Sequence, residues 1–186
     1  MNGRLSSSVL SWTALAVAAA LCGGCQTQSS TTASQGAAAA ANAQAEANKA
    51  TFRRFMEAFN QGDTTVVDSF VTENIVDHSP MPGLAPGRAG LNQIVVALHA
   101  GFPDLKMTVE DIVADGDKVW AYSTTSGTMK GMFMSMKPTG KAMTNVQGFD
   151  LVRFENGKMV EHWGVSDNTA MAQQLGWVPP PGKPKK

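Results

Sequence analysis

The hydrophobic period of this chain changes once, at Pro103, and that change restricts the folds open to it. Before Pro103, apolar residues recur every three or four positions, which predicts amphipathic helices. These positions are Phe52, Phe55, Met56 and Phe59 in one helix and Leu91, Ile94, Val95, Leu98 and Phe102 in another. After Pro103, apolar and polar residues alternate, as in half-buried strands. Helices followed by an antiparallel meander predict an α+β fold. In it, helices pack on a strongly curved antiparallel or mixed sheet and leave a cone-shaped pocket.

Turn signals separate the expected strands. Asp115-Gly-Asp117 and Lys137-Pro-Thr-Gly140 interrupt the alternation, and Asn156-Gly157 is a strong two-residue hairpin signal. Asn60-Gln-Gly-Asp63 ends the first helix and caps a short second helix that contains Val67, Phe70 and Val71. The segment from Asn74 to Gly87 holds three prolines and two glycines, so we expect it to be irregular.

The first 24 residues are typical of a targeting signal. The apolar run from Val9 to Leu21 is too short for a membrane span, which needs roughly 20 residues. Leu21-Cys-Gly-Gly-Cys25 resembles a bacterial lipoprotein signal, which predicts lipidation of Cys25. Ordinary signal cleavage and an uncleaved signal anchor are the alternatives. We therefore expect an exported protein of the bacterial cell envelope, anchored by lipid in the periplasm or at the outer membrane.

The remaining chain divides by composition. Residues 25–45 are mostly Ser, Thr, Gln and Ala and predict a flexible tether, although the alanines from Ala37 to Ala47 favour helix. The folded domain is expected over residues 46–178, and residues 179–186 are expected to form a Pro- and Lys-rich disordered tail.

The cysteine count and the charge exclude several kinds of site. Only Cys22 and Cys25 occur, so the domain has no thiol for catalysis, disulfides or zinc. The formal net charge is zero, without a basic patch for nucleic acid.

The most informative stretch for function is Gly157 to Gly176. Met159, Glu161, Trp163 and Val165 share one strand face, and Asp167 shares it too if no bulge intervenes. A carboxyl beside apolar residues can act as both base and acid in an aldol-type ring closure. Asp167 also precedes a helical pattern and fits an N-cap. Both interpretations stay open.

The histidines give weaker predictions. His78 follows Asp77 in the Pro-rich segment, where it either orients a substrate or ties down the loop. His162 has the opposite parity to Glu161, so we expect it to face a dimer interface or solvent rather than the pocket. Three widely spaced histidines, without a close pair on one element, do not predict a metal site.

Residues from about Thr51 to Gly176 resemble the SnoaL-like polyketide cyclase (ester cyclase) family of the nuclear transport factor two-like superfamily. The elements that carry the resemblance keep the family's order and spacing. They are Asn60-Gln-Gly-Asp63, Asp77-His78, Gly87-Arg-Ala-Gly90, Phe102-Pro-Asp104, Asp115-Gly-Asp-Lys-Val119, Gly127-Thr128, Lys137-Pro-Thr-Gly-Lys141, Arg153-Phe-Glu-Asn-Gly-Lys158, Glu161-His-Trp163, Asp167 and Gln174-Leu-Gly176. The resemblance implies a curved-sheet cone, usually a dimer, and an intramolecular aldol closure without metal or organic cofactor. The family's acid/base Asp corresponds to Asp167.

Two departures from the family pattern concern the substrate. Met129 stands where the family usually has His, and Met132, Met134 and Met136 make the following lip apolar and adaptable. Both favour a flexible apolar ligand. The expected catalytic residues are Asp167 and His78. The expected substrate-binding residues are Phe55, Phe59, Trp120, Met129, Phe133, Gln147, Phe149, Glu161 and Trp163.

Two functions follow from these residues. The first is a cyclase or isomerase that acts on a small apolar carbonyl compound, polyketide-like in chemistry, by Asp acid/base catalysis. The second is a non-catalytic, lipid-anchored binding domain for an apolar ligand or a partner protein. Retention of Asp167 favours the first, and the predicted tether and lipid favour the second.

Overall fold

The structure, a computed structural model, describes residues 25–179 of the 186, and their side chains from residue 34 onward. Its elements follow in the order α1 (Cys25–Gln61), α2 (Thr64–Phe70), β1 (Val71–Asp77), α3 (Gly87–Gly101), β2 (Lys106–Asp115), β3 (Lys118–Thr128), β4 (Ala142–Glu155), β5 (Lys158–Ser166) and α4 (Asn168–Leu175). Of the described residues, 25–37 belong to a unit separate from the compact domain, which begins at Ala38.

Helix α1 begins earlier than expected. It starts at Cys25, so the predicted flexible tether over residues 25–45 is helical in the structure. The alanines from Ala37 to Ala47 favour the second part of this segment as helix, because Ala has the highest helix propensity. Among the described residues, no helix is both long and apolar enough to cross a membrane. The predicted signal peptide over residues 1–24 lies outside the described residues.

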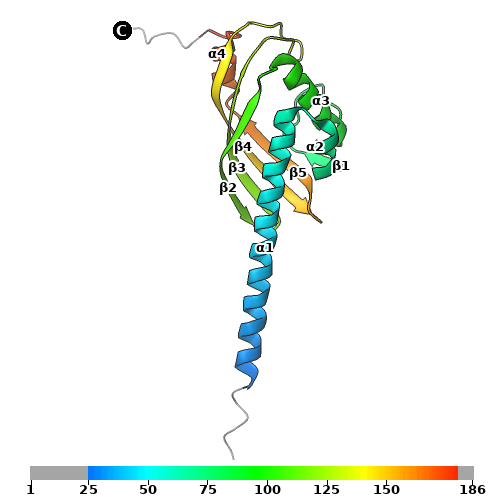
Figure 1. The fold of residues 1–186 in the computed structure, drawn as a ribbon, viewed down its shortest axis with the longest axis vertical. Coiled ribbons are helices and arrows are strands. Elements are labelled where there is room, and N and C mark those ends of the chain that lie inside the picture. The colour runs from blue at the N-terminus through cyan, green and yellow to red at the C-terminus, as the bar shows by residue number, and fades with distance from the viewer. Residues whose placement is uncertain (1–24, 180–186) are drawn as a thin grey trace, which may run out of the picture. The chain divides into compact units, whose positions relative to one another are not determined.

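The five strands form one mixed sheet in the order β1-β5-β4-β3-β2. Strands β2 to β5 pair antiparallel, and β1 pairs parallel to β5. In Figure 1 the domain part of α1 crosses the sheet, while α2 and α3 lie next to β1. The predicted α+β class, with helices on a mixed sheet, is confirmed.

The hairpin turns agree with the sequence. Asn156 and Gly157 connect β4 to β5 with φ of 50° and 75°, as a primed two-residue turn requires. Gly116, with φ of 58°, begins the turn between β2 and β3. The expectation of an irregular segment from Asn74 onward is wrong in its first residues. Strand β1 runs to Asp77 because Val71 and Ile75 are buried and pairing with β5 satisfies its backbone.

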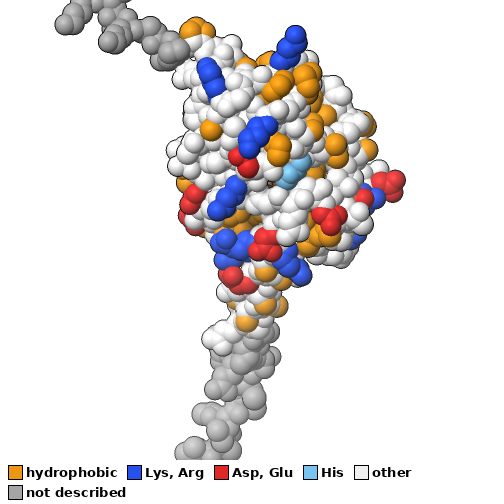
Figure 2. Space-filling model, turned by 45° about the horizontal axis from the view of Figure 1, so that its top comes forward, with side chains coloured by type: hydrophobic (Ala, Val, Ile, Leu, Met, Phe, Trp, Pro, Cys, Tyr) orange, Lys and Arg blue, Asp and Glu red, His pale blue; other side chains and the backbone are white. Residues whose placement is uncertain are grey.

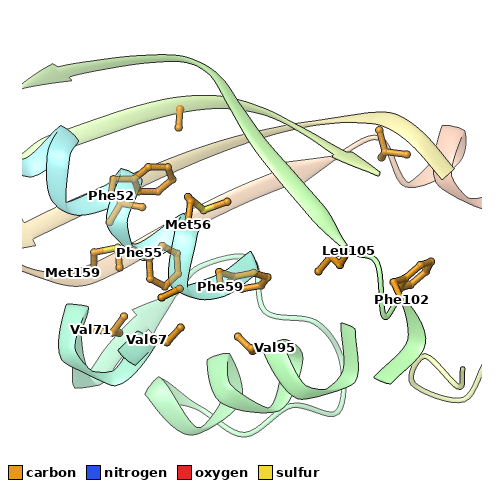
Figure 3. Packing of buried hydrophobic residues seen from close by; sticks show 14 of the residues in the cluster. Phe52, Phe55, Met56, Phe59, Val67, Val71, Val95, Phe102, Leu105 and Met159 are labelled. Carbon is orange, nitrogen blue, oxygen red and sulfur yellow. The ribbon is translucent and has the colours of Figure 1, made fainter. Parts of the chain in front are cut away.

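The core lies between α1 and the sheet. Phe52, Phe55, Met56 and Phe59 are all less than a tenth exposed. Figure 3 shows Phe55 and Phe59 of this row above Val67, Val71 and Val95, with Met159 beside Phe55. The aromatic stripe read from the sequence is therefore the helix face that closes the concave side of the sheet.

Candidate functional site

A cavity of about 730 Å³ opens inside the domain between the aromatic face of α1, strand β1, helix α3 and the loop over residues 78–86. Most of its wall is apolar. The apolar lining includes Phe52, Phe55, Met56, Phe59, Leu91, Ile94, Met107 and Met159. A cavity of this size, with few polar groups, is of the kind that holds small organic ligands.

Three ionisable side chains converge on one side of this cavity, and we call them the carboxylate–imidazole cluster: Asp77, Asp150 and His162. The imidazole Nδ1 of His162 lies 3.0 Å from Asp77 Oδ1, and its Nε2 lies 3.2 Å from Asp150 Oδ1. The sheet register brings them together. His162 pairs with Asp77 across β1 and β5, while Asp150 pairs with Gly164, two residues further along β5.

The charges of the cluster depend on each other. Burial lowers the pKa of His162, but hydrogen bonds and charge attraction from Asp150 and Asp77 outweigh it and raise the pKa to about 9. The hydrogen bond from His162 in turn lowers the pKa of Asp77, helped by the Ser79 backbone N–H and opposed by burial. At neutral pH His162 is therefore an imidazolium that donates from both nitrogens, one to each carboxyl group of the cluster.

The two carboxylates differ in what else they contact. Asp77 Oδ1 also accepts a hydrogen bond from Ser79 N, at 2.9 Å. Asp150 receives only the bond from His162, through Oδ1, so within residues 34–179 its Oδ2 makes no hydrogen bond. Asp77 Oδ2 likewise makes no hydrogen bond within these residues. The difference is that Asp77 is also tied to the loop backbone, whereas His162 is the one hydrogen-bond partner of Asp150 within residues 34–179.

Gly164 leaves room for the imidazole. A Cβ on Gly164 would lie 2.9 Å from His162 Cε1 and 3.0 Å from Nε2, closer than side chains tolerate. The Gly164 backbone N–H donates to Ser79 Oγ at 3.3 Å, which joins β5 to the loop above the cavity. The absence of a side chain at this position allows His162 to reach Asp150.

The structure places Asp167 outside the cavity. Its carboxylate accepts a hydrogen bond from Ala170 N at 2.8 Å and caps α4, and its side chain is exposed. The capping interpretation is confirmed. Asp167 is not among the residues that line this cavity.

The expected orientation of His162 is wrong, because β5 contains a bulge. Met159 pairs with Phe154 and Glu161 with Arg153, which leaves Val160 as an extra residue. The extra residue reverses the alternation, so Met159 and His162 both point inward. Glu161 and Trp163, expected to bind substrate, lie on the opposite face of the sheet and do not line the cavity.

His78 lies on that outer face with Glu161 and Trp163. Its Nε2 is 3.0 Å from Glu161 Oε2, and its ring stacks on Trp163 with centroids 4.2 Å apart and planes at 4°. Arg153 Nε donates to Glu161 Oε1 at 2.7 Å. The hydrogen bond from His78, followed by that from Arg153, lowers the pKa of Glu161 against the effect of burial. None of these three residues lines the cavity, and the contact of His78 with Glu161 and Trp163 was not expected from the sequence.

The other predicted substrate-binding residues divide into three groups. Phe55 and Phe59 line the cavity as expected. Met129 and Phe133 are buried in the core away from it, at 0% and 5% exposure. The rest, Trp120, Gln147 and Phe149, lie outside the cavity, and Phe149 stacks on Tyr122 with centroids 5.0 Å apart.

Sequence reasoning missed all three members of the carboxylate–imidazole cluster as site residues. The alternation in β4 could have identified Asp150. It lies on the same strand face as the buried residues Val146, Gly148 and Val152, so its carboxylate was to be expected on the inner face of the sheet. Among the side chains that the structure describes, no group of three or more His, Cys, Asp or Glu is arranged to hold a metal ion.

Comparison with known proteins gives consistent results. Residues 49–175 match the family model described as SnoaL-like polyketide cyclase. IdmH from Streptomyces antibioticus is 34% identical, with 69% of this chain and 98% of that chain covered and a TM-score of 0.61. TsrD from Streptomyces laurentii is 27% identical, covering 69% and 97%, with a TM-score of 0.62. A SnoaL-like polyketide cyclase from Agrobacterium tumefaciens shares the fold at 24% identity, 69% and 98% coverage and a TM-score of 0.58. No curated protein sequence matches the chain.

Proposed function

Because this chain belongs to the SnoaL-like polyketide cyclase family, we propose that it is a cyclase or isomerase for a small apolar, polyketide-like carbonyl compound. We assign the acid/base role to Asp150. One observation supports this assignment above all: His162 is the one hydrogen-bond partner of Asp150 among the described residues, so this carboxylate has an unbonded oxygen at an apolar cavity, whereas Asp77 is also tied to the loop backbone through Ser79 N.

The proposed reaction needs only proton transfer and a new carbon–carbon bond. Asp150 Oδ2 takes a proton from a carbon next to a carbonyl, and the resulting enolate attacks a second carbonyl of the same molecule. The new alkoxide then takes the proton back from Asp150, so the product is an isomer of the substrate and the carboxylate is regenerated. Electrons are not exchanged with any carrier, so the reaction itself calls for no redox cofactor.

His162 has a positioning role in this scheme. Its two N–H groups point to Asp77 and Asp150, which fixes the ring and holds the Asp150 carboxylate in one orientation. Its positive charge also lies next to the region where the enolate charge develops, which favours that charge in a cavity of low polarity. The aromatic face of α1 excludes water and holds the apolar part of the compound.

Hydrogen–deuterium exchange of candidate substrates tests this function without knowledge of the product. β-Dicarbonyl compounds of polyketide type are incubated with the protein in D₂O, and deuterium uptake next to the carbonyl is followed by NMR. Asp150→Asn should reduce the catalysed exchange by about 10²-fold or more, whereas Asp167→Asn should leave it unchanged. Loss of exchange in Asp167→Asn with retention in Asp150→Asn would return the acid/base role to Asp167.

A binding module is the second candidate function, and the methionines of the cavity favour it. Met56, Met107 and Met159 give the wall a flexible, polarisable lining that adapts to different apolar ligands. Under this function, apolar ligands bind with measurable heat, but no tested carbonyl compound exchanges its protons faster than in buffer. The exchange experiment therefore separates the two candidates.

We further propose that the protein is exported and anchored in the bacterial cell envelope through lipidated Cys25. This proposal is supported by the sequence of the first 25 residues alone. Cells that express the wild-type chain with labelled palmitate should yield a labelled protein in the detergent phase. Cys25→Ser should abolish the label, and a labelled Cys25→Ser protein would contradict the proposal.

A further inference from the structure

The loop between β3 and β4 displays three methionines to solvent. Met132, Met134 and Met136 are 52%, 38% and 42% exposed. Isolated apolar residues on a surface are ordinary, but three on one short loop form a local apolar tip. The loop lies at the top of Figure 1, and Figure 2 shows hydrophobic side chains next to Lys and Arg side chains on the face that includes this end.

The loop is held rigidly in this arrangement. Phe133 and Met136 form a two-residue hairpin, with Phe133 N donating to Met136 O at 3.2 Å and Met136 N to Phe133 O at 2.9 Å. Phe133 itself is buried and packs against Phe102 and Trp177, at centroid distances of 5.6 and 6.5 Å. At the base of the loop, Gly131 N bonds to Gly101 O at 3.0 Å. The methionines are therefore exposed by a fixed backbone.

The backbone at Met134 is strained. Its φ is 53°, in the left-handed region, at the turn position where glycine is preferred. Glycine there would relieve the strain and also remove an exposed apolar side chain. A methionine is thus retained at a position where both backbone geometry and solvation oppose it, which indicates a role for its side chain.

Positive charge surrounds the apolar tip. From Val119 to Phe149 the sequence has no Asp or Glu, but it has Lys130, Lys137 and Lys141, all exposed. The nearby carboxylate of Asp104 already accepts hydrogen bonds from Thr128 N and Oγ1, at 2.7 and 2.8 Å.

We propose that this methionine–lysine loop, residues 130–141, is a contact site for an anionic lipid bilayer. The methionine side chains enter the interface between headgroups and acyl chains, while the lysines remain at the level of the lipid phosphates. Apolar insertion combined with nearby Lys is the chemistry of peripheral membrane contact. The contact lies outside the cavity and does not depend on the proposed catalytic function.

Peptide-resolved amide hydrogen exchange on the full chain tests the proposal. Vesicles of equal parts phosphatidylglycerol and phosphatidylcholine should protect residues 130–141, whereas pure phosphatidylcholine should not. Because exchange is measured for each peptide separately, vesicle binding by the N-terminal segment does not affect the protection measured for residues 130–141. Lys130→Gln and Lys137→Gln should each lower the equilibrium constant for protection about fivefold, the value of one lysine near an anionic surface.

Met134→Gly provides the sharper variant. Relief of strain should leave thermal stability equal or higher, while vesicle protection of the loop falls. Val96→Ser, which removes an apolar side chain 61% exposed on α3, is the matched control and should keep full protection. Unchanged loop protection in Met134→Gly, equal protection by both vesicle types, or no protection at all would each overturn the membrane contact. The last outcome would point to a protein partner for the loop.

Discussion

Asp77 in β1 and His162 in β5 are direct partners across the parallel strand pair, and the carboxylate oxygen lies 3.0 Å from the imidazole Nδ1. The pair joins segments 85 residues apart in the chain. It also couples the stability of the fold to the protonation of the His162 imidazole, which binds Asp150 at the cavity as well. The cluster should therefore be visible in stability measurements before any substrate is known.

Stability should fall as pH rises from neutral to alkaline. The pKa of His162 is about 9 in the folded chain and about 6.5 when unfolded. A raised pKa stabilises the fold fully below the unfolded value, and this contribution is lost as pH rises through the folded value. Because the His162 side chain is 32% exposed, solvent screens part of its interaction with the two carboxyl groups. We therefore expect the free energy of unfolding to fall by roughly 2 kcal/mol, less than the pKa shift alone would give. Urea unfolding between pH 6 and 10, compared with His162→Gln, measures it.

The comparison with His162→Gln isolates the imidazole, since every other ionisable group is present in both proteins. The difference in unfolding free energy between wild type and variant should shrink between the unfolded pKa of 6.5 and the folded pKa of about 9, with half of it lost midway between these values. A difference that stays constant over this range would show that the imidazole is not charged in the fold.

Gly164→Ala should disrupt the cluster without unfolding the domain. The new Cβ would lie 2.9 Å from the His162 ring, which can rotate away but then loses Nε2 contact with Asp150. We expect the pKa of His162 to fall, as seen by imidazole NMR titration, and catalysed deuterium exchange to fall by about 10²-fold, the effect of misplacing a catalytic group by an ångström. The matched control is Gly148→Ala, whose Cβ would meet its nearest atoms at 3.4 Å. Equal effects of the two substitutions would contradict this role of Gly164.

Asp167→Ala should cost about 1 kcal/mol of unfolding free energy, the usual value of a lost N-cap. Asp167→Asn should cost much less, because its amide oxygen still accepts from Ala170 N. Asp63→Ala gives a reference, since Asp63 caps α2 in the same way with a bond of 3.1 Å to Val66 N. Urea unfolding of the three variants measures the effect, and a neutral Asp167→Ala would be inconsistent with the cap.

The outer face of the sheet should join two copies of the chain, as the family resemblance implies. Val113, Trp120, Phe149 and Val165 are 56%, 40%, 55% and 68% exposed on β2 to β5. Phe149→Lys should shift the protein from dimer to monomer in sedimentation velocity. Val96→Lys, at a position 61% exposed on α3, should not. A wild-type chain that sediments as a monomer at micromolar concentration would refute the dimer.

Local signals predicted most of the fold. Turn residues such as Asn156-Gly157 and caps such as Asp63 act within a few residues, and the structure places them as expected. Strand β1 was missed because its partner β5 is far away in the sequence. The bulge at Val160 was missed because nothing in the residues around it marks an extra position. The site depends on both features, which explains why Asp77 and His162 were not identified while the fold was.

The bulge at Val160 has a consequence for how such domains diversify. The way in which this one residue is accommodated decides whether His162 or the pair Glu161 and Trp163 points into the cavity from β5. If Val160 instead took a place in the regular alternation, Glu161 and Trp163 would turn inward and His162 outward, while the sheet kept its strand order. Deletion of Val160 would have no such effect, because Met159 and Glu161 would keep their partners Phe154 and Arg153 in a regular ladder and His162 would stay inward. A change between bulged and regular pairing at this one position is thus a route to new chemistry that leaves the catalytic side chains themselves unchanged.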